Sequence, residues 1–402
     1  MLLLLSSLRV GGSEAKTVRL ANALAQRGGH VVLAYLNEPD TLADRLDPEV
    51  TLIDLKRRGK LSLRALTALT SAIRAQRTGC LVSVNLYPAL YASLARWRVG
   101  AGRPRWIAAL NTTQIAGAKL AVQMPLYRWA LSSADLLLFG AESQRQLWRE
   151  RHGVGAHAGR TAVLHNGVDT ARFAPTTRSP GPRLGLETRW IIGSVGQLRP
   201  EKAHLHLLRA AATLRAQGLD VGLVLVGEGP ERARILAERD RLQLEPYVVL
   251  TGEMRDVRPA LAAMDVFVLS SVAIETFSNA VLEAMACGVP VVSSRIGGME
   301  ELLEGGGGLL YPPGDAQALV RVLKELLPDE ARRGELARAA RNEVVQRFGW
   351  ERMVQRFIKL LAGEAPAALR GDTSREAGVE GNAATVTARA PEHSLRRSSL
   401  TP

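Results

Sequence analysis

Cysteine and aromatic residues are scarce in this sequence. Of its 402 residues, 2 are Cys and 4% are Phe, Trp or Tyr. Cys80 and Cys287 lie far apart, each in an apolar stretch, which indicates buried thiols in a reducing compartment and excludes a disulfide scaffold or a cysteine-ligated metal site. His204 and His206 are two positions apart and point to different faces of a helix, so the histidines give no metal site either. We therefore expect no bound metal.

Long hydrophobic runs are absent as well. The apolar run Leu2–Leu5 is too short for a signal peptide and has no basic residue before it, so it predicts a first strand. The nearest candidate for a membrane span, residues 120–141, carries Arg128 and Asp135. The sequence therefore predicts a protein that does not span a membrane. We expect a cytoplasmic location, with peripheral binding at the inner face of the plasma membrane as an option.

Negative charge is scarce in the first part of the chain. The net charge is +13, and residues 1–160 hold 22 Lys plus Arg against 10 Asp plus Glu, while the remaining 242 residues hold 30 and 29. Cations gather at Lys56–Lys60 and, among indole rings, at Arg96–Trp106. Such mixtures suit an anionic membrane surface or nucleic acid, and a solvated Arg-rich face without a partner is the alternative. No nucleic-acid-binding motif accompanies them, so we expect no nucleic-acid partner.

The sequence does contain a regular alternation of short apolar runs with amphipathic segments. The runs that predict strands are residues 2–6, 30–36, 50–55, 81–84, 106–110, 135–139, 162–164, 190–195, 221–226, 248–251, 266–269, 289–293 and 309–311. Most are continuously apolar, which is typical of parallel strands buried on both faces, with helices as crossovers. We therefore predict an α/β fold with two Rossmann-like, doubly wound domains that face a central cleft.

A proline-rich connector, Pro175–Pro182, separates the two halves. We place an N-terminal domain at residues 1–168 and a C-terminal domain at residues 183–347. A last helical segment covers residues 348–363. The remaining residues, 364–402, lose periodicity and are rich in Ala, Gly, Ser, Thr, Pro and Arg, which predicts a disordered tail.

Two strand-to-helix loops have the composition of phosphate-binding loops, which in parallel sheets lie at the carboxyl ends of strands. Gly11 and Gly12 open the first helix and can bring the backbone close to a ligand, although a tight structural turn is the alternative. The loop from Gly196 to Lys202 places Arg199 and Lys202 between a strand and a helix, where both cations can converge on an anion.

A third loop joins a strand ending at Leu269 to a short helix that begins near Ser278 or Asn279. Backbone N–H groups around Phe277–Asn279 can hold a pyrophosphate at the helix N-terminus. Glu275 on the loop can accept hydrogen bonds from sugar hydroxyls, and Glu283, one turn into the helix, from those of a ribose. A surface helix with two solvated glutamates is the alternative.

These motifs together resemble glycosyltransferase family 4, over about residues 1–362. The resemblance rests on the Glu-x7-Glu spacing of Glu275 and Glu283 inside ETFSNAVLEAMACGVPVV, and on Gly297-Gly298-Met299-Glu300-Glu301 after it. Further matching segments are Gly11–Glu14, His165–Asp169 continuing to Phe173, Gly196–Lys202 and Phe348–Arg352.

The resemblance implies the two-domain GT-B fold and a retaining transfer of a hexose from a nucleotide-diphosphate sugar to an acceptor hydroxyl, without a metal or cofactor. The N-terminal domain is then the acceptor side, the C-terminal domain binds the nucleotide sugar, and the last helix crosses back. By position, Glu275 holds sugar hydroxyls, Glu283 the ribose, and Arg199 and Lys202 the diphosphate. The implied catalytic residues are Glu275, Lys202 and Arg199.

The loop Gly252–Met254 is implied to lie beside the base, with uridine favoured on family frequency. The full donor-binding prediction is Gly11, Gly12, Asn111, Gly196, Gln197, Arg199, Lys202, Gly252, Met254, Glu275, Phe277, Ser278, Asn279 and Glu283. Gln197 stands where many members carry arginine. Asn111 lies in a segment where many carry histidine, and its amide can hydrogen-bond a donor hydroxyl but cannot act as a base.

No Asp-x-Asp follows a predicted strand, so fixed cations and helix dipoles are expected to stabilise the departing diphosphate, whose oxygen can take the acceptor proton. The expected partners are a nucleotide-sugar donor, a lipid-linked or cell-envelope glycan acceptor and an anionic membrane surface. A catalytically silent nucleotide-sugar-binding protein and a sugar-nucleotide epimerase are the alternatives. A dinucleotide oxidoreductase is disfavoured, because the third glycine of that fingerprint is Arg232 here.

Overall fold

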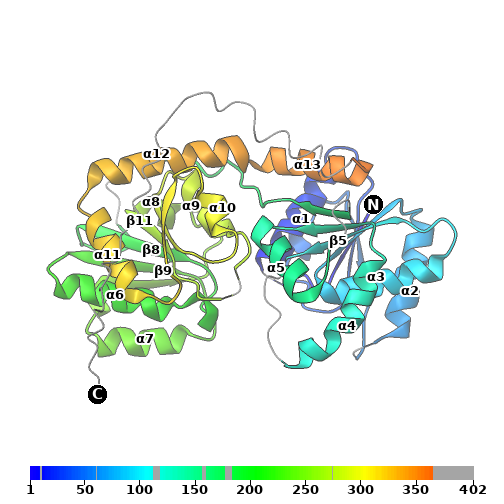
Figure 1. Cartoon of the computed structure of the whole chain (residues 1–402), viewed down its shortest axis with the longest axis horizontal. Coiled ribbons are helices and arrows are strands. Elements are labelled where there is room, and N and C mark those ends of the chain that lie inside the picture. The colour runs from blue at the N-terminus through cyan, green and yellow to red at the C-terminus, as the bar shows by residue number, and fades with distance from the viewer. Residues whose placement is uncertain are drawn as a thin grey trace, which may run out of the picture.

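The computed structural model describes residues 1–9, 11–59, 61–111, 118–155, 160–176, 183–273 and 275–364 (Figure 1). The predicted disordered tail lies outside these residues, apart from Glu364. The described residues form two parallel sheets, and the predicted fold class is confirmed. The domain limits at residues 168, 183, 347 and 363 stay predictions.

The first sheet has the strand order β3-β2-β1-β4-β5-β6-β7. Its strands are β1 (Leu2–Leu5), β2 (Val32–Tyr35), β3 (Thr51–Asp54), β4 (Cys80–Val84), β5 (Arg105–Leu110), β6 (Leu136–Phe139) and β7 (Thr161–Val163). The helices that connect them are α1 (Gly12–Ala25), α2 (Leu63–Ala75), α3 (Leu86–Val99), α4 (Ala118–Ser132) and α5 (Glu142–His152), with a short 3-10 turn η1 (Ala43–Arg45). Helices α2 to α5 cover one face of this sheet, and α1 covers the other.

The second sheet has the order β10-β9-β8-β11-β12-β13. Its strands are β8 (Trp190–Val195), β9 (Val221–Val226), β10 (Val248–Gly252), β11 (Val266–Leu269), β12 (Val291–Ser294) and β13 (Gly308–Tyr311). Its helices are α6 (His204–Ala216), α7 (Arg232–Arg241), α8 (Arg258–Ala263), α9 (Asn279–Ala286), α10 (Met299–Leu303), α11 (Ala316–Leu326) and α12 (Glu330–Arg347), with 3-10 turns η3 (Pro200–Lys202) and η4 (Glu245–Tyr247). All predicted strands are present, with ends that differ by at most two residues.

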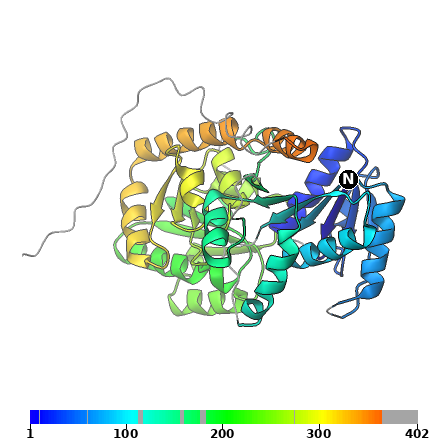
Figure 2. The same ribbon diagram turned by 45° about the vertical axis from the view of Figure 1, so that its right-hand side comes forward.

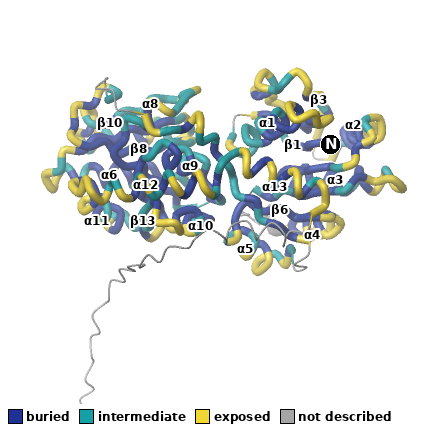
Figure 3. The backbone as a smooth tube through the Cα atoms, turned by 90° about the horizontal axis from the view of Figure 1, so that it is seen from above, coloured by how far each residue is buried: buried dark blue, intermediate teal, exposed yellow. Residues whose placement is uncertain are grey.

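The cores follow from the sequence pattern. Strands such as β1 and β9 are buried along their whole length, because helices cover both faces of each sheet. In the tube view of Figure 3 the buried strands lie inside and exposed segments mark the outer sides of the helices. Cys80 and Cys287 are free and only partly buried, which corrects the expectation of buried thiols.

The last helix, α13 (Trp350–Ala362), returns from the second sheet to the first. Helices α12 and α13 run along the top of the molecule in Figure 1, and the turned view in Figure 2 shows α13 beside the N-terminal half. Met353, Val354 and Phe357 pack into the same core as α1, whereas α12 packs on the second sheet. At the junction between α12 and α13, the N–H of Val168 donates to the carbonyl of Phe348 at 2.9 Å.

Candidate active site

The carboxyl ends of the two sheets meet, and hydrogen bonds cross between them. Asn111, directly after β5, accepts from the Thr276 hydroxyl at 3.0 Å. The same Asn111 donates from its side chain to the Ser13 hydroxyl at 2.6 Å and from its backbone to Asn85 at 3.0 Å. Its amide group is thus held in place within the first half while its carbonyl contacts the second. This arrangement brings the predicted loops of both halves to one place.

Helix α9 begins where the sequence predicted. Ser278 is its N-cap, in extended conformation, and its hydroxyl accepts from the N–H of Val281 at 3.4 Å. Leu282 and Met285 are fully buried and fix the helix on the second core. The N-terminus of α9 therefore faces the first half, where a Cβ added to Gly12 would lie 3.5 Å from the Asn279 amide. This is an ordinary van der Waals distance, so the starts of α1 and α9 lie side by side.

Glu275 and Lys202 form an ion pair at this meeting point. The Lys202 Nζ lies 2.5 Å from the Glu275 carboxylate, and the Ser271 hydroxyl donates to the same oxygen at 3.1 Å. Glu275 is buried, with 8% of its surface exposed, whereas Lys202 is half-buried. The two predicted catalytic residues, from loops about seventy positions apart, are therefore in direct contact. Ser271 was not predicted, although its position after a predicted strand and four residues before Glu275 could have indicated it.

The Gly297-Gly298 pair holds the Glu275 loop. Gly297 has a φ of +56°, and a Cβ added there would lie 2.1 Å from the Glu275 carbonyl oxygen. The N–H of Gly298 donates to the Thr276 carbonyl at 2.7 Å, and a Cβ at Gly298 would clash with Ala141 and Phe277. A side chain at either position forces the loop to move. The glycine pair of the motif is therefore part of the support for Glu275.

Glu283 lies half-buried on α9, as predicted. Burial raises the pKa of its carboxyl to about 7, and the nearby cations Arg19 and Arg172 only partly offset this effect. Arg19 comes from α1, where its guanidinium stacks over the Trp350 ring at 4.2 Å. Among the described residues, none forms a hydrogen bond or ion pair with the Glu283 carboxyl. The carboxyl is therefore available to a ligand's hydroxyl groups.

A second set of contacts links α1, through Asn166, to the loop of Glu275 and Phe277 before α9, which we call the donor loop. Lys16 donates to the Asn166 side-chain oxygen at 2.7 Å, and the Asn166 amide donates to the Phe277 carbonyl at 2.8 Å. Burial lowers the pKa of Lys16 to about 8. Sequence reasoning missed Lys16 and Arg19, although both lie on α1 one turn apart and behind the glycine loop.

Glu301, the last residue of the glycine motif, binds the first half directly. Its carboxylate accepts from the N–H groups of Glu142 at 2.8 Å and Ser143 at 2.7 Å, at the N-terminus of α5. It also contacts His165 at 3.1 Å, whose ring stacks on Phe277 with a centroid distance of 4.6 Å. Burial opposes ionisation of Glu301, but these hydrogen bonds outweigh it and lower its pKa to about 2.

The remaining predicted donor residues lie on the loops of the second sheet. Gly196 lies at the end of β8, with its N–H bonded to Val226, and Gln197 beside it is exposed. Gly252 has a φ of +77° and its carbonyl accepts from the N–H of Gly227 at 2.9 Å. Met254 is partly buried against the core that holds α9. The role of this loop at the base stays a prediction.

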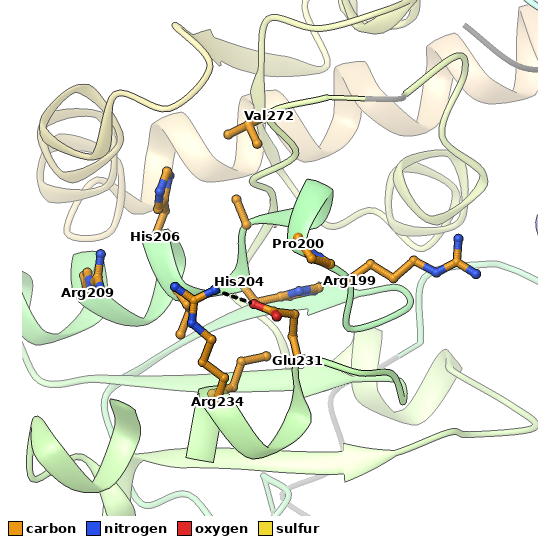
Figure 4. A pocket seen from close by; sticks show the side chains of 11 residues that line it. Arg199, Pro200, His204, His206, Arg209, Glu231, Arg234 and Val272 are labelled. Atoms are coloured by element: carbon orange, nitrogen blue, oxygen red, sulfur yellow. Dashed lines mark hydrogen bonds and ion pairs between the residues drawn. The ribbon is translucent and has the colours of Figure 1, made fainter. Parts of the chain in front are cut away.

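Arg199 does not join the Lys202–Glu275 pair. Its side chain is 46% exposed and lies 3.8 Å from Glu201. Its stem lines a cavity of about 150 Å³ behind the loop, between the starts of α6 and α7, and Figure 4 shows its guanidinium pointing away from the other lining residues. His204, also lining this cavity, is 4% exposed, and burial, with the Lys202 cation, lowers its pKa to about 4.

The described residues contain no candidate metal site and no candidate membrane span. No group of three or more His, Cys, Asp or Glu in the described ranges has the arrangement of a metal site. Within the same ranges, no helix is long and apolar enough to cross a membrane. Independence from metals and cofactors stays a prediction.

Comparison with known proteins identifies the family of this chain. The family model "Glycosyltransferase Family 4" matches residues 10–172, and the model "Glycosyl transferases group 1" matches residues 189–329. A GDP-mannose-dependent alpha-(1-6)-phosphatidylinositol monomannoside mannosyltransferase from Mycolicibacterium smegmatis is 31% identical over 69% of this chain and 75% of its own length. The chain belongs to glycosyltransferase family 4. Another relative is a D-inositol 3-phosphate glycosyltransferase from Salinispora tropica, 34% identical over 52% of this chain and 47% of its own length.

Solved structures support the same family 4 fold. A UDP complex of HepE from Anabaena covers 90% of this chain and 99% of its own, with a TM-score of 0.78 at 21% identity. The lipopolysaccharide glycosyltransferase WaaG covers 90% of this chain and all of its own, with a TM-score of 0.68 at 16% identity. The family models and the relatives make this chain a glycosyltransferase, and the solved structures show its GT-B fold, of which the two sheets are the two halves.

Proposed function

We propose that this glycosyltransferase moves a hexose from a nucleotide-diphosphate sugar to a hydroxyl of a lipid-linked or cell-envelope glycan, with retention of anomeric configuration. The observation that supports the proposal most directly is the contact between Lys202 and the buried Glu275 beside the N-terminus of α9. A cation, a carboxylate and unpaired N–H groups there match a diphosphate and a sugar bound side by side.

In the proposed reaction, the donor diphosphate competes with Glu275 for the Lys202 ammonium. Glu275 is then free to accept hydrogen bonds from the sugar hydroxyls and orients the sugar. As the bond between the anomeric carbon and the diphosphate oxygen breaks, Lys202, Arg199 and the N-terminus of α9 stabilise the negative charge that develops on the leaving group. The acceptor oxygen bonds to the anomeric carbon on the face that the diphosphate leaves, and its proton passes to the diphosphate.

The base is proposed to be uridine, and GDP-mannose is a second candidate donor. The second candidate is favoured by the names of the relatives from Mycolicibacterium smegmatis and Corynebacterium glutamicum, which are GDP-mannose-dependent mannosyltransferases acting on phosphatidylinositol mannosides. Those names also support a lipid-linked acceptor for this chain. Such an acceptor fits a cytoplasmic enzyme that binds at the inner face of the plasma membrane.

Thermal unfolding with a panel of nucleotide diphosphates and their sugars, with and without magnesium, tests the donor. A ligand at 100 times its dissociation constant adds about 2.7 kcal/mol to the free energy of unfolding. We expect one base to stabilise the protein without magnesium, with the effect lost in Glu283→Ala and kept in the exposed-surface control Glu304→Ala. No stabilisation by any nucleotide would overturn the proposal.

Turnover separates the transferase from its alternatives. The proposed activity releases nucleoside diphosphate in proportion to glycosylated acceptor, whereas an epimerase converts the donor sugar without an acceptor. A catalytically silent protein binds the donor and releases nothing. Lys202→Met should abolish release of the nucleoside diphosphate.

A further inference from the structure

The net positive charge of the chain equals the charge of one segment. Residues 55–134 contain 13 Lys plus Arg and neither Asp nor Glu. Subtracting these 13 from the total of 52 Lys plus Arg leaves 39, which equals the 39 Asp plus Glu of the whole chain. The net charge of +13 is therefore the charge of this one segment.

The described residues of this segment all belong to the N-terminal half. It runs from the end of β3 through α2, α3 and α4, which pack side by side on one face of the first sheet (Figure 1). Eight of its cations are exposed: Lys56, Arg58, Arg64, Arg74, Arg77, Arg98, Arg103 and Arg128. In the described parts of the chain, none of these eight forms an ion pair. We call this surface the α2–α4 face.

Large apolar side chains are exposed among these cations. Six of the nine exposed large hydrophobic residues of the described chain belong to this face: Leu61, Leu63, Trp97, Val122, Leu126 and Trp129. On α4, Val122, Leu126 and Trp129 follow one another at spacings of four and three, so they share one side of the helix. They are 82%, 45% and 57% exposed. Trp97, at the end of the neighbouring α3, is 81% exposed.

We propose that the α2–α4 face binds an anionic phospholipid bilayer, with the arginines at the headgroup phosphates and the side chains of Val122, Leu126 and Trp129 inserted at the acyl boundary. Basic side chains around an exposed apolar stripe are the composition of interfacial helices. Two surfaces of this kind would repel each other, since the segment has no carboxylates, which disfavours a second copy as the partner. Aliphatic Val122 and Leu126 offer nothing to a nucleic acid, whose bases stack on aromatic rings.

The face lies next to the acceptor side of the proposed site. Helix α4 follows β5 in the chain, and Asn111 at the end of β5 contacts the donor loop through Thr276. A bilayer bound to α4 would thus present a lipid-linked acceptor beside the carboxyl end of the first sheet. The inference deepens the proposed function and rests on it only for this last point, because binding to vesicles requires no turnover.

The test is co-sedimentation of the full-length chain with phosphatidylcholine vesicles, with or without one third phosphatidylglycerol. We expect binding only with the anionic lipid, strong at about 0.01 M salt and weak at about 1 M, where the Debye length falls from about 30 to about 3 Å. Arg98→Glu with Arg103→Glu should weaken partitioning by about thirtyfold or more, since each arginine near the surface contributes about fivefold. Val122→Ser with Leu126→Ser and Trp129→Ser should weaken it by about tenfold or more.

Matched controls come from residues outside the α2–α4 face. Arg338→Glu with Arg352→Glu reverses two exposed arginines on α12 and α13, and Val345→Ser removes an apolar side chain that is 48% exposed. These controls should bind vesicles like wild type. All variants should keep the wild-type melting temperature and its shift with nucleotide, so that a failure of donor binding is distinguished from a failure of membrane binding.

Three results would overturn the proposal. One is binding of the protein to vesicles that does not depend on anionic lipid or on salt concentration. Another is a mobility shift of double-stranded nucleic acid that Arg98→Glu with Arg103→Glu abolishes, without vesicle binding. The third is a concentration-dependent dimer that Val122→Ser with Leu126→Ser and Trp129→Ser abolishes, again without vesicle binding.

Discussion

The contact between Lys202 and Glu275 gives a prediction at the scale of single residues. Lys202→Met leaves the Glu275 carboxylate buried with the Ser271 hydroxyl and without its cation. Removing one partner of such a pair is destabilising, and we expect the free energy of unfolding to fall by about 2 to 3 kcal/mol in urea titrations. Adding Glu275→Gln should restore most of the stability but no transferase activity. Equal stability of Lys202→Met and wild type would show that the pair is not a structural contact.

Glu283 predicts a pH dependence for donor binding. Its pKa is raised to about 7 by burial, so its contribution to the free energy of unfolding declines as the pH rises from about 4.5 to 7. Ribose hydroxyls donate to the ionised carboxylate, so affinity for the nucleotide sugar should increase with pH up to about 7 and then level off. Below that pH we expect about a tenfold loss per unit, measured by calorimetry. Glu283→Gln should bind weakly with no such slope; an unchanged slope would assign the titration to another group.

At the scale of elements, α13 packs on the N-terminal half of the molecule through one side only. Phe357 is 2% exposed and packs in the core between α1 and the first sheet, whereas its neighbour Ile358 is 37% exposed. Phe357→Ala should therefore cost about 3 to 5 kcal/mol. We expect hydrogen exchange to accelerate in β1 and β2 and to stay unchanged in β8. Ile358→Ala, the matched control, should leave both sheets as protected as in wild type, and equal effects of the two variants would contradict this packing.

At the scale of the whole molecule, Glu301 connects the two halves. The pKa of its carboxyl is about 2, so the stabilisation it provides is present above about pH 4.5 and is lost as the pH falls towards 2. At pH 7, Glu301→Gln should lower the free energy of unfolding by about 3 kcal/mol. Glu301→Gln should also increase the radius of gyration in X-ray scattering, because one of the two oxygens that accept from the first turn of α5 is replaced by an NH2 group that cannot accept.

The neighbouring Glu300 is the control for Glu301. It pairs with Arg295 on the surface, where both side chains are more than half exposed, so Glu300→Gln should change stability by less than about 1 kcal/mol. The difference between wild type and Glu301→Gln should shrink as the pH falls from 4.5 to 2. A difference that is independent of pH would mean that the ionised carboxylate is not what holds α5.

The sequence by itself determined the strands, the fold class and the start of α9. Strands buried on both faces need continuous apolar runs, and a helix start needs a polar cap such as Ser278; both requirements are local and therefore readable. The charge of the α2–α4 face is equally a property of one continuous segment.

Only the tertiary structure decided which of these residues meet. Lys202 contacts Glu275, and Glu301 binds the start of α5, because parallel sheets collect the loops after all their strands at one edge. No local pattern states which loop faces which across that edge, and Lys16 and Arg19 look like ordinary exposed cations of α1 in the sequence. Their partial burial depends on residues more than a hundred positions away along the chain, Asn166 beside Lys16 and Trp350 beside Arg19.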